Sequence, residues 1–426
     1  MGIGSSVLPG KCGGFGRERI MYKIKETEDR EKYILLLPAM LDAHFPLLKY
    51  AFYSRNYHPV ILENEEGITD TGLRYVNHDM CYPAILNVGQ MVAALKSGAF
   101  DTERTVLLMP QAGDACRGSN YISVLRRAVA AAGFPEVRAL SLNAKGLEKE
   151  NRVKLDAGMV WRAFFGLFYS DILMLLKNQV EPYEKESGAA AECHRRWQNL
   201  LAEDLKRGRH LTCGAMRRNF LRMAEEFSAI PRTHAVKQKI GIVGELYVKY
   251  CHLGNWNLEK FLREEDCEYY INGLSWYVLY YIDTHLAAEG GAARLLYGIG
   301  QRFLEHYQKK MIKALRDHGF YSADAFTEFK RAAEGYVSFH CTTGDGWLIG
   351  AEAVAHIRGG YRKVIAAQPF DCMPNHVCGR GLYPSLQRKL PEGQLVSVNV
   401  DASGSKLNYY NRIKMLIDAP EHVKRG

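Results

Sequence analysis

Short apolar runs alternate with amphipathic stretches in the first third of the chain, and this pattern predicts a parallel sheet covered by helices. An uninterrupted apolar run indicates a strand buried on both faces, whereas an apolar repeat of about 3.6 residues indicates a helix. The pattern predicts strands at 33–38, 59–62, 105–109 and 137–142, with helices at 45–55, 83–96 and 119–133. Alternation of this kind is typical of an α/β domain.

The strand signal then disappears and returns near residue 239. Between these points the sequence predicts one long helix at 160–177 and one or two more within 189–227. The pattern predicts later strands at 239–243, 337–340, 364–367 and 394–400. It predicts helices at 255–264, 276–287, 293–317 and 408–417, and one that follows the loop 341–347 and ends at 357.

We therefore expect an α/β fold in which two Rossmann-like parallel-sheet domains are separated by a helical insert. The predicted parts are a disordered tail at 1–30, a first α/β cysteine-loop domain at 31–145, a helical insert at 146–232, and a second α/β domain with the Cys372 loop at 233–426.

Composition and charge narrow the class of protein. The chain has 426 residues, of which 47% are hydrophobic and 24% charged, as is ordinary for a soluble globular protein. Its net charge of +9 comes from lysines and arginines scattered through predicted helices. The favoured explanation of this charge is a solvated surface, the second is an anionic small ligand, and a nucleic-acid partner is the least expected.

Neither a membrane span nor a secretory signal is predicted. The most apolar stretch, 161–176, is interrupted by Arg162 and Asp171, so we expect a core helix there. The N-terminus lacks the apolar region of a signal peptide, and we expect a cytoplasmic protein.

The ten cysteines do not predict a disulfide scaffold, because the chain is long and carries no secretory signal. Four of them lie in sequence without glycine or proline punctuation, and we interpret these as ordinary core or surface thiols. They are Cys193, Cys213, Cys251 and Cys267.

Three other cysteine-bearing loops share one arrangement, in which cysteine stands in a loop just before a helix. Cys81 lies in NHDMCYP, Cys116 in QAGDACRGSN, and Cys372 with Cys378 in QPFDCMPNHVCGRG. The loops of Cys116 and Cys372 follow predicted strands, and open α/β sheets place their sites at the carboxyl ends of strands, so we expect the three loops to form one ligand set.

Thiolates bind zinc, cuprous copper or iron–sulfur clusters. The absence of a Cys-x-x-Cys pair weighs against structural zinc, whereas single cysteines on separate loops suit a cluster held between domains. Three protein ligands would leave one iron open to a substrate oxygen. An iron–sulfur cluster is the favoured interpretation, with thiols that bind no metal second and zinc third.

Several motifs together resemble the 2-hydroxyacyl-CoA dehydratase superfamily. They are NHDMCYPAILNVGQ, MPQAGDACRGSNYISVLRRA, LSLNAKGLEKEN, IGIVGELYVKY, TTGDGWLIGAE and QPFDCMPNHVCGRG. They run in the same order as in the family, from about Tyr33 to Leu416. The likeness is greatest to the C-terminal, dehydratase-like part of the large CoA-dehydratase activase-related proteins.

This resemblance implies a [4Fe-4S] or double-cubane cluster bound by cysteines, with Cys81, Cys116 and Cys372 in the matching loops. Cys378 is a fourth ligand or a neighbour by the same resemblance, and Cys341 is a weaker candidate. In the family, an activator uses ATP hydrolysis to inject one electron at low potential, and the 2-hydroxyacyl-CoA substrate forms a ketyl radical that expels hydroxide. Related double-cubane proteins reduce small molecules instead.

The sequence departs from the large relatives in having neither a Walker A loop nor the Asp-x-Gly-Ser phosphate motif of the activator. We therefore expect a separate ATPase activator subunit, and a homo- or heterodimer. The leading hypothesis is a reductase component acting on an acyl-CoA or a small molecule. The alternative is a non-catalytic electron-relay or assembly subunit.

Four further residues carry two interpretations each. Glu245 is a candidate base or substrate contact, or a helix cap. His376 is a candidate proton donor, or it orients the cysteine loop. Arg117 would compensate cluster charge or meet a CoA phosphate, or belongs to the surface. Asn120 is a candidate cofactor contact, although it and the neighbouring Ser119 are first of all expected to cap a helix.

Overall fold

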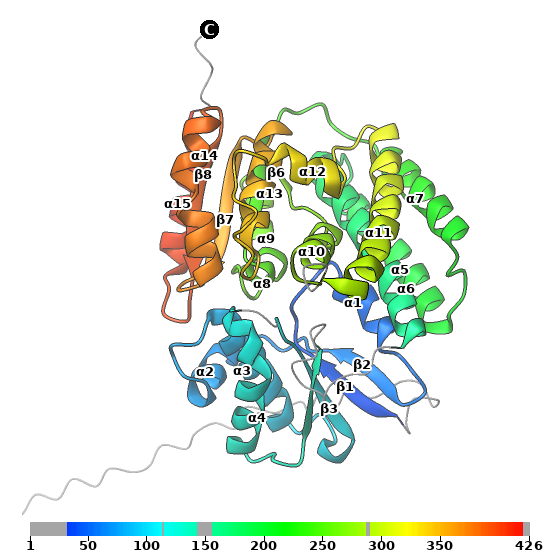
Figure 1. Cartoon of the computed structure of the whole chain (residues 1–426), viewed down its shortest axis with the longest axis vertical. Helices are drawn as coiled ribbons and strands as arrows, with labels where there is room; N and C mark the ends of the chain where they lie inside the picture. The colour runs from blue at the N-terminus through cyan, green and yellow to red at the C-terminus, as the bar shows by residue number, and fades with distance from the viewer. Residues whose placement is uncertain (1–31, 113–114, 143–155, 287–289, 421–426) are drawn as a thin grey trace, which may run out of the picture.

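Two four-stranded, all-parallel sheets organise the part of the chain that the computed structural model describes, residues 32–112, 115–142, 156–286 and 290–420. The predicted tail at 1–30 lies outside the described residues. The first sheet has the order β2-β1-β3-β4 (Figure 1). Its strands are β1 (Tyr33–Leu37), β2 (Tyr57–Ile61), β3 (Thr105–Pro110) and β4 (Arg138–Leu142).

The first sheet is surrounded by short and medium helices. These are α1 (Phe45–Leu48), which continues as the 3-10 turn η2 (Lys49–Ala51), α2 (Ile68–Tyr75), α3 (Tyr82–Lys96), the 3-10 turns η3 (Thr102–Arg104) and η4 (Arg117–Asn120), and α4 (Tyr121–Ala131). Helix α3 is apolar on nearly every face and is buried between the sheet and α2. Pro83 stands in its first turn, where its missing N–H costs nothing.

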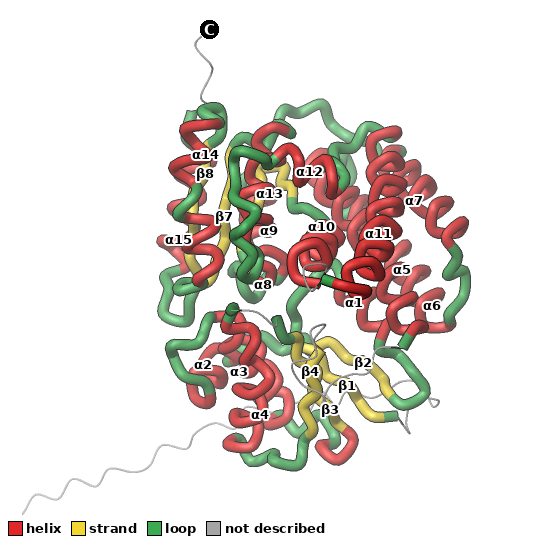
Figure 2. The backbone as a smooth tube through the Cα atoms, in the orientation of Figure 1, coloured by secondary structure: helices red, strands yellow, loops and turns green. Residues whose placement is uncertain are grey.

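A layer of long helices follows, and Figure 2 shows it beside both sheets. It contains α5 (Ala157–Val180), the 3-10 turn η5 (Glu181–Tyr183), α6 (Ala189–Arg207) and α7 (Cys213–Ser228), against which α11 (Gly291–Asp317) packs. The segment Ala157–Tyr183 is long and apolar enough to cross a membrane, but 78% of its most apolar window is buried inside the fold. The prediction of a core helix at 161–176 is confirmed.

The two charged residues in that apolar stretch have defined partners. Asp171 is fully buried, where its carboxylate accepts hydrogen bonds from the backbone N–H groups of Leu274 and Ser275 and contacts His44 Nε2 at 2.8 Å. Arg162 donates to the carbonyl of Tyr53 at 3.0 Å. The charges therefore connect the core helix to its neighbours.

The second sheet repeats the strand order of the first, as β6-β5-β7-β8. Its strands are β5 (Gln238–Gly244), β6 (Cys267–Tyr270), β7 (Lys363–Pro369) and β8 (Gln394–Val400). Its remaining helical elements are α8 (Leu246–Tyr250), α9 (Leu258–Glu264), α10 (Leu274–Tyr281), the π-helical turn η6 (Ile282–Leu286), α12 (Phe326–Ala332), α13 (Gly346–Arg358), the π-helical turn η8 (Asn375–Arg380), α14 (Tyr383–Lys389) and α15 (Lys406–Asp418). The predicted class, two parallel-sheet α/β units with added helices, is confirmed.

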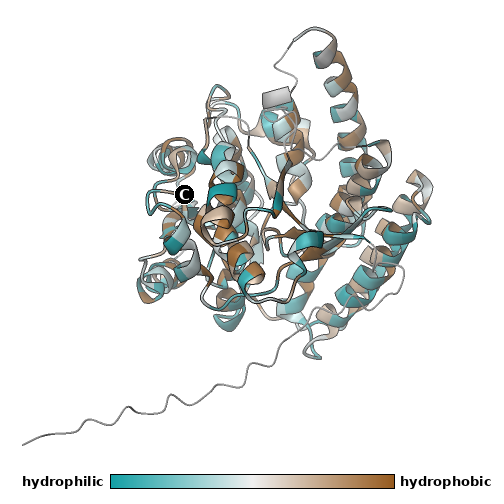
Figure 3. Cartoon of the chain, turned by 90° about the horizontal axis from the view of Figure 1, so that it is seen from below, coloured by the Kyte–Doolittle hydropathy of each residue, from teal (hydrophilic) through white to brown (hydrophobic). Residues whose placement is uncertain are grey.

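Hydrophobic residues, brown in the ribbon of Figure 3, occur in the strands and along the helices that surround them. The largest cluster joins the helical layer to the second sheet, whereas α3, α4 and one face of the first sheet form a separate cluster. The first sheet unit therefore has a core of its own, while its Leu47, Tyr82 and Leu86 belong to the largest cluster and connect it to the rest of the molecule.

The predicted strands differ from the described ones in two places. The run 337–340 is not a strand, because the N–H of Val337 bonds back to the carbonyl of Ala333 and a turn continues from α12. Strand β6 was not predicted, because it is only four residues long and contains Glu268. That carboxylate is buried, where it accepts hydrogen bonds from the hydroxyls of Tyr183 and Tyr361.

Candidate functional site

The carboxyl edges of the two sheets face each other, and two contacts described here join the segments beside them. Arg117 pairs with Asp371 across the gap at 3.0 Å. The hydroxyl of Tyr281, at the end of α10, donates to the carbonyl of Ala112 at 2.9 Å. The two sheets have the same order, so the segments after β3 and β7 meet next to the point where each strand order reverses, where open α/β folds bind ligands.

The first predicted ligand, Cys81, is buried at the position just before α3. Its Sγ lies 2.7 Å from the hydroxyl of Tyr121, the first residue of α4. Burial raises the pKa of Tyr121, so the hydroxyl keeps its proton and can donate to sulfur. Burial also raises the pKa of the Cys81 thiol, and the Tyr121 hydrogen bond opposes that rise.

The second predicted ligand, Cys116, is half-buried at the start of η4, where its Sγ accepts a hydrogen bond from the N–H of Gly118 at 3.4 Å. Gly344, from the other side of the gap, links this loop to that of Cys372. A Cβ built on Gly344 would lie 2.8 Å from Pro374 Cγ and 3.9 Å from Cys116 Cβ. The Cys116 and Cys372 loops therefore approach each other around Gly344.

The third predicted ligand, Cys372, is buried just after β7. The amide nitrogen Nδ2 of Asn375 donates to its Sγ at 3.4 Å and to Asp345 Oδ2 at 3.3 Å. Asn375 is fully buried, and its Oδ1 has no hydrogen-bond partner among the described residues. Burial raises the pKa of the Cys372 thiol, and the negative charge of Glu245 adds to that rise.

Cys378 lies in η8, in contact with a different thiol. Burial raises its pKa to about 12, and the neighbouring Cys341 thiol contributes to the rise. The structure thus pairs Cys378 with Cys341, the weaker sequence candidate. Cys378 is therefore better described as a neighbour of the three-cysteine group than as its fourth member.

Two carboxylates, Glu245 and Asp345, stand between these thiols. Glu245 follows β5, caps α8 by accepting from the N–H of Val248 at 2.9 Å, and adds to the raised pKa of both Cys81 and Cys372. Burial and the neighbouring charge of Asp345 raise the pKa of Glu245 to about 8. Burial also raises the pKa of Asp345. The capping interpretation of Glu245 is confirmed, and its negative charge also acts on the thiols.

The remaining candidates take positional roles. The ring of His376 contacts the carbonyl of Cys372 through Nδ1 at 2.9 Å, which is the loop-orienting contact expected from one of its two interpretations. Arg117 is exposed in its pair with Asp371, and its charge lowers the pKa of Cys81. The expected caps are wrong: Asn120 stands at the N-cap position of α4, but its exposed side chain accepts no cap hydrogen bond, and Ser119 lies inside η4.

The three cysteines are soft donors, but a raised thiol pKa opposes the thiolate form that both nucleophilic attack and metal binding need. Burial raises the pKa of both Cys81 and Cys372, and the charge of Glu245 adds to the rise. Cys81, Cys116 and Cys372 each have a hydrogen-bond contact to sulfur, from a hydroxyl, a backbone N–H and an amide, the groups that tune cluster-bound sulfur. The three cysteines would be the ligands of such a group.

Sequence reasoning did not single out Asn375 and Tyr121. Asn375 lies in the CMPNHVC loop, where the signal was its position three residues after Cys372. Tyr121 gave no signal, because its contact with Cys81 joins residues 40 positions apart.

No family model matches the chain, and a search of curated proteins finds no significant relative.

Proposed function

We propose that the chain is an iron–sulfur, dehydratase-like reductase component that receives low-potential electrons from a separate ATP-dependent activator. Its substrate would be a 2-hydroxyacyl-CoA or a small molecule, and its location the cytoplasm. The observation that carries the proposal is the convergence of the Cys81, Cys116 and Cys372 loops where the two sheet edges meet.

The chain's own residues would set the properties of this site. A bound [4Fe-4S] or double-cubane cluster would supply one-electron chemistry at low potential. Tyr121, the N–H of Gly118 and Asn375 would donate hydrogen bonds to the three ligand sulfurs, and fewer such donors would make the potential more negative.

Glu245 is the strongest candidate for holding a proton at the site. With a pKa raised to about 8 it is mostly protonated at neutral pH, and it faces thiols from both sheet units. His376 is a positioning residue, since the contact of its Nδ1 fixes the loop of Cys372. Glu245→Gln would keep the shape of this group but remove its ability to exchange a proton.

An electron-donating partner needs a surface near the ligands. Phe370, Met373 and Val377 surround Cys372 in sequence, and their side chains are 57%, 49% and 64% exposed. Exposed apolar side chains grouped on one loop favour a protein contact. The activator subunit would dock against this loop.

Anaerobic purification with iron, sulfide and zinc assays and visible and EPR spectra tests the proposal. We expect about four irons and four sulfides per chain, or twice that content for a double-cubane protein. Cys81→Ala, Cys116→Ala and Cys372→Ala should each lose the metal, whereas Cys213→Ala, at a half-buried thiol on α7, should keep it. A folded protein with no iron after reconstitution would contradict the proposal, and zinc without visible absorbance would favour a zinc protein.

A non-catalytic relay or assembly subunit is the second candidate, favoured by an exposed apolar face on α11. Leu295, Leu296 and Ile299 on this helix are 70%, 67% and 58% exposed. In that case the spectrum of bound iron would not change when an acyl-CoA or a small oxidant is added. A change in the spectrum would favour the reductase.

A further inference from the structure

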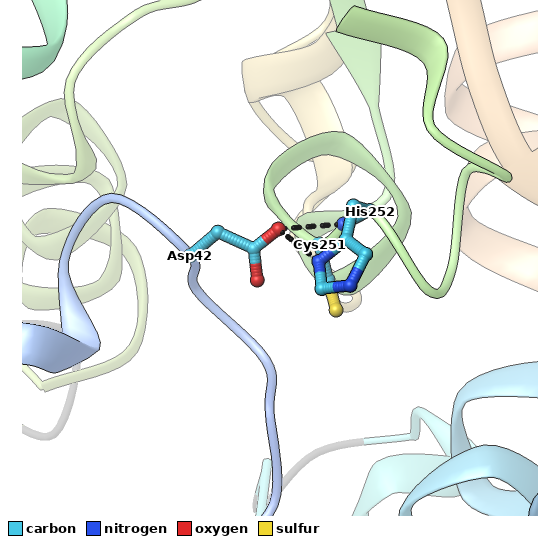
Figure 4. A group of neighbouring side chains, drawn as sticks. All are labelled: Asp42, Cys251 and His252. Atoms are coloured by element: carbon cyan, nitrogen blue, oxygen red, sulfur yellow. Dashed lines mark hydrogen bonds and ion pairs between the residues drawn. The ribbon is translucent and has the colours of Figure 1, made fainter. Parts of the chain in front are cut away.

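A second group of metal-binding side chains lies at the seam between the first sheet unit and α8. It consists of Asp42, Cys251 and His252, whose ligand atoms all lie within 4.8 Å of one another (Figure 4). Asp42 belongs to the segment between β1 and α1, and the other two directly follow α8. The group therefore joins residues more than 200 positions apart. Because that proximity is not visible in the sequence, Cys251 was interpreted there as an ordinary core or surface thiol.

The three side chains are held in place by the backbone around them. The N–H of Asp42 donates to the carbonyl of Tyr250 at 3.1 Å, and the N–H of His252 donates to Asp42 Oδ2 at 2.7 Å. Cys251 is fully buried, and its Sγ lies 3.4 Å from the carbonyl of Ala39. The positions of the ligands are thus fixed by both units before any ion binds.

The imidazole of His252 lies between two carboxylates, with each ring nitrogen at hydrogen-bond distance from a carboxylate oxygen. Its Nδ1 faces Asp42 Oδ2 at 2.7 Å, and its Nε2 contacts Glu65 Oε1 at 3.0 Å. A ligating histidine commonly donates its second N–H to a carboxylate, which fixes the tautomer and the ring orientation. Glu65 occupies that position, so Nδ1 is the nitrogen directed toward Asp42 and Cys251.

We propose that Asp42, Cys251 and His252 bind one divalent ion of the zinc class, which fastens the segment after β1 to the end of α8. Thiolate and imidazole together select zinc-like ions over magnesium or calcium. Three protein ligands leave a fourth position for water, and the side chains of His252 and Asp42 are 33% and 38% exposed, so water can reach it.

The ion would replace the hydrogen bond between Asp42 and His252. Two ligand atoms at zinc distances are about 3.4 Å apart in a tetrahedral site, against the 2.7 Å between Oδ2 and Nδ1. The part-exposed carboxylate of Asp42 can move by this difference without disturbing the core. Cys251 would exchange its contact with Ala39 for the ion, and the thiol proton of Cys251 and the Nδ1 proton of His252 would both be released to solvent.

This site is independent of the proposed cluster, because it uses none of the residues assigned to the cleft. It also has a mechanical consequence, since Glu245 in the cleft caps the N-terminus of α8 and Cys251 directly follows its last residue. An ion at its far end would fix the position of the helix that presents Glu245.

Cobalt(II) titration of the full chain after anaerobic chelator treatment tests the proposal, because cobalt bound to a thiolate absorbs in the near ultraviolet. We expect one equivalent to give this band, with a Tm that rises as metal is added. Cys251→Ser and His252→Gln should lose the band, and Cys213→Ser should keep it. Glu65→Gln should weaken binding by about 10–100-fold.

Two results would overturn the zinc-class site. One is the absence of thiolate-to-cobalt absorption in the parent protein. The other is a band that persists in Cys251→Ser but disappears in Cys81→Ser, which would assign the ion to the cleft. Because Cys251 is buried, the far-ultraviolet circular dichroism of each variant must match the parent, and the part-exposed His252→Gln variant keeps the test valid if Cys251→Ser does not fold.

Discussion

The two sheet units share one strand order but differ in what they bury. In the described part of the first unit, the buried polar residues of the sheet and of helices α2 to α4 are uncharged. They are Asn87, Gln90, Thr105 and Ser141. In the second unit, Lys249 and Glu352 form a fully buried ion pair, with Nζ at 2.8 and 2.9 Å from the two carboxylate oxygens.

The two units therefore differ in the electrostatic environment that they present to the cleft. The first unit holds Cys81 and Cys116 on an apolar scaffold, whose rigidity comes from packing. The second unit adds fixed charges beside the cleft, and the field of Lys249 lowers the pKa of both Glu245 and Asp345 against the effect of burial. The second unit would thus control the electrostatics of ligands held by both.

The largest expected effect comes from breaking the buried ion pair. Lys249→Met leaves the carboxylate of Glu352 buried without its cation, and we expect the free energy of unfolding to fall by about 3–5 kcal/mol. Urea unfolding measures this loss. The double variant Lys249→Met/Glu352→Leu should recover most of it, because an apolar pair of similar volume leaves no charge unpaired.

The exposed pair of Lys260 and Glu264 is the matched control, with its atoms 3.8 Å apart and its side chains 67% and 63% exposed. Lys260→Met should change the free energy of unfolding by less than about 1 kcal/mol. If Lys249→Met lowered the free energy of unfolding no more than Lys260→Met does, water would reach the interior of the second unit. The two units would then not differ in how they bury charge.

A smaller effect is expected where β5 passes β7. Gly244 has a φ of +131°, and a Cβ built on it would lie 1.9 Å from the carbonyl oxygen of Ala367. We expect Gly244→Ala to cost about 2–4 kcal/mol, because both backbone strain and the clash oppose it. It should also shift Glu245, whose N–H donates to the same oxygen.

Gly98 in the first unit separates the two causes. Its φ is +67° but nothing lies within 4 Å of a built Cβ, so Gly98→Ala should cost only the strain, about 1 kcal/mol. Thermal unfolding of both variants measures the difference. Equal losses would mean that β7 yields to the clash, and that the edge of the second sheet is not rigid.

The fold was predictable wherever a local pattern was strong. Seven of the eight strands lie at apolar runs, and the long helix α5 was clear from its composition. The four-residue run 337–340 was mistaken for a strand, because a short apolar segment can have the same composition in a turn as in a strand. The class of fold followed from the alternation of elements, which survives such local errors.

The candidate site was predictable only in part, because its contacts join distant residues. The cysteine loops had a signal, since each precedes a helix, but the pairing of Cys378 with Cys341 did not. The role of Asn375 between Cys372 and Asp345 requires three dimensions, as does the group of Asp42, Cys251 and His252. A pattern along the chain carries no information about which side chains meet across a seam.

The smallest expected effect is a loss of stability in acid, caused by a buried histidine of the second unit. His356 lies on α13 against the ring of Tyr270, its Nε2 faces the carbonyl of Ile242 at 3.4 Å, and Nδ1 has no partner among the described residues. Burial, assisted by the charge of Lys249, lowers its pKa to about 3. The imidazole is therefore neutral in the folded protein throughout the mildly acidic range.

The sign of the effect follows from comparison with an unfolded pKa of about 6.5. Below that value the unfolded chain binds a proton that folded His356 does not, so its contribution to stability is complete above pH 6.5 and is lost as the pH falls toward 3. We expect a slope of up to about 1.4 kcal/mol per pH unit, or roughly 1–2 kcal/mol between pH 6.5 and 5. His356→Gln should flatten this slope in urea unfolding at several pH values. Identical slopes for parent and variant would show that the interior of the second unit accepts a proton as readily as solvent does, and the charge contrast between the two units would then be a matter of ion pairs alone.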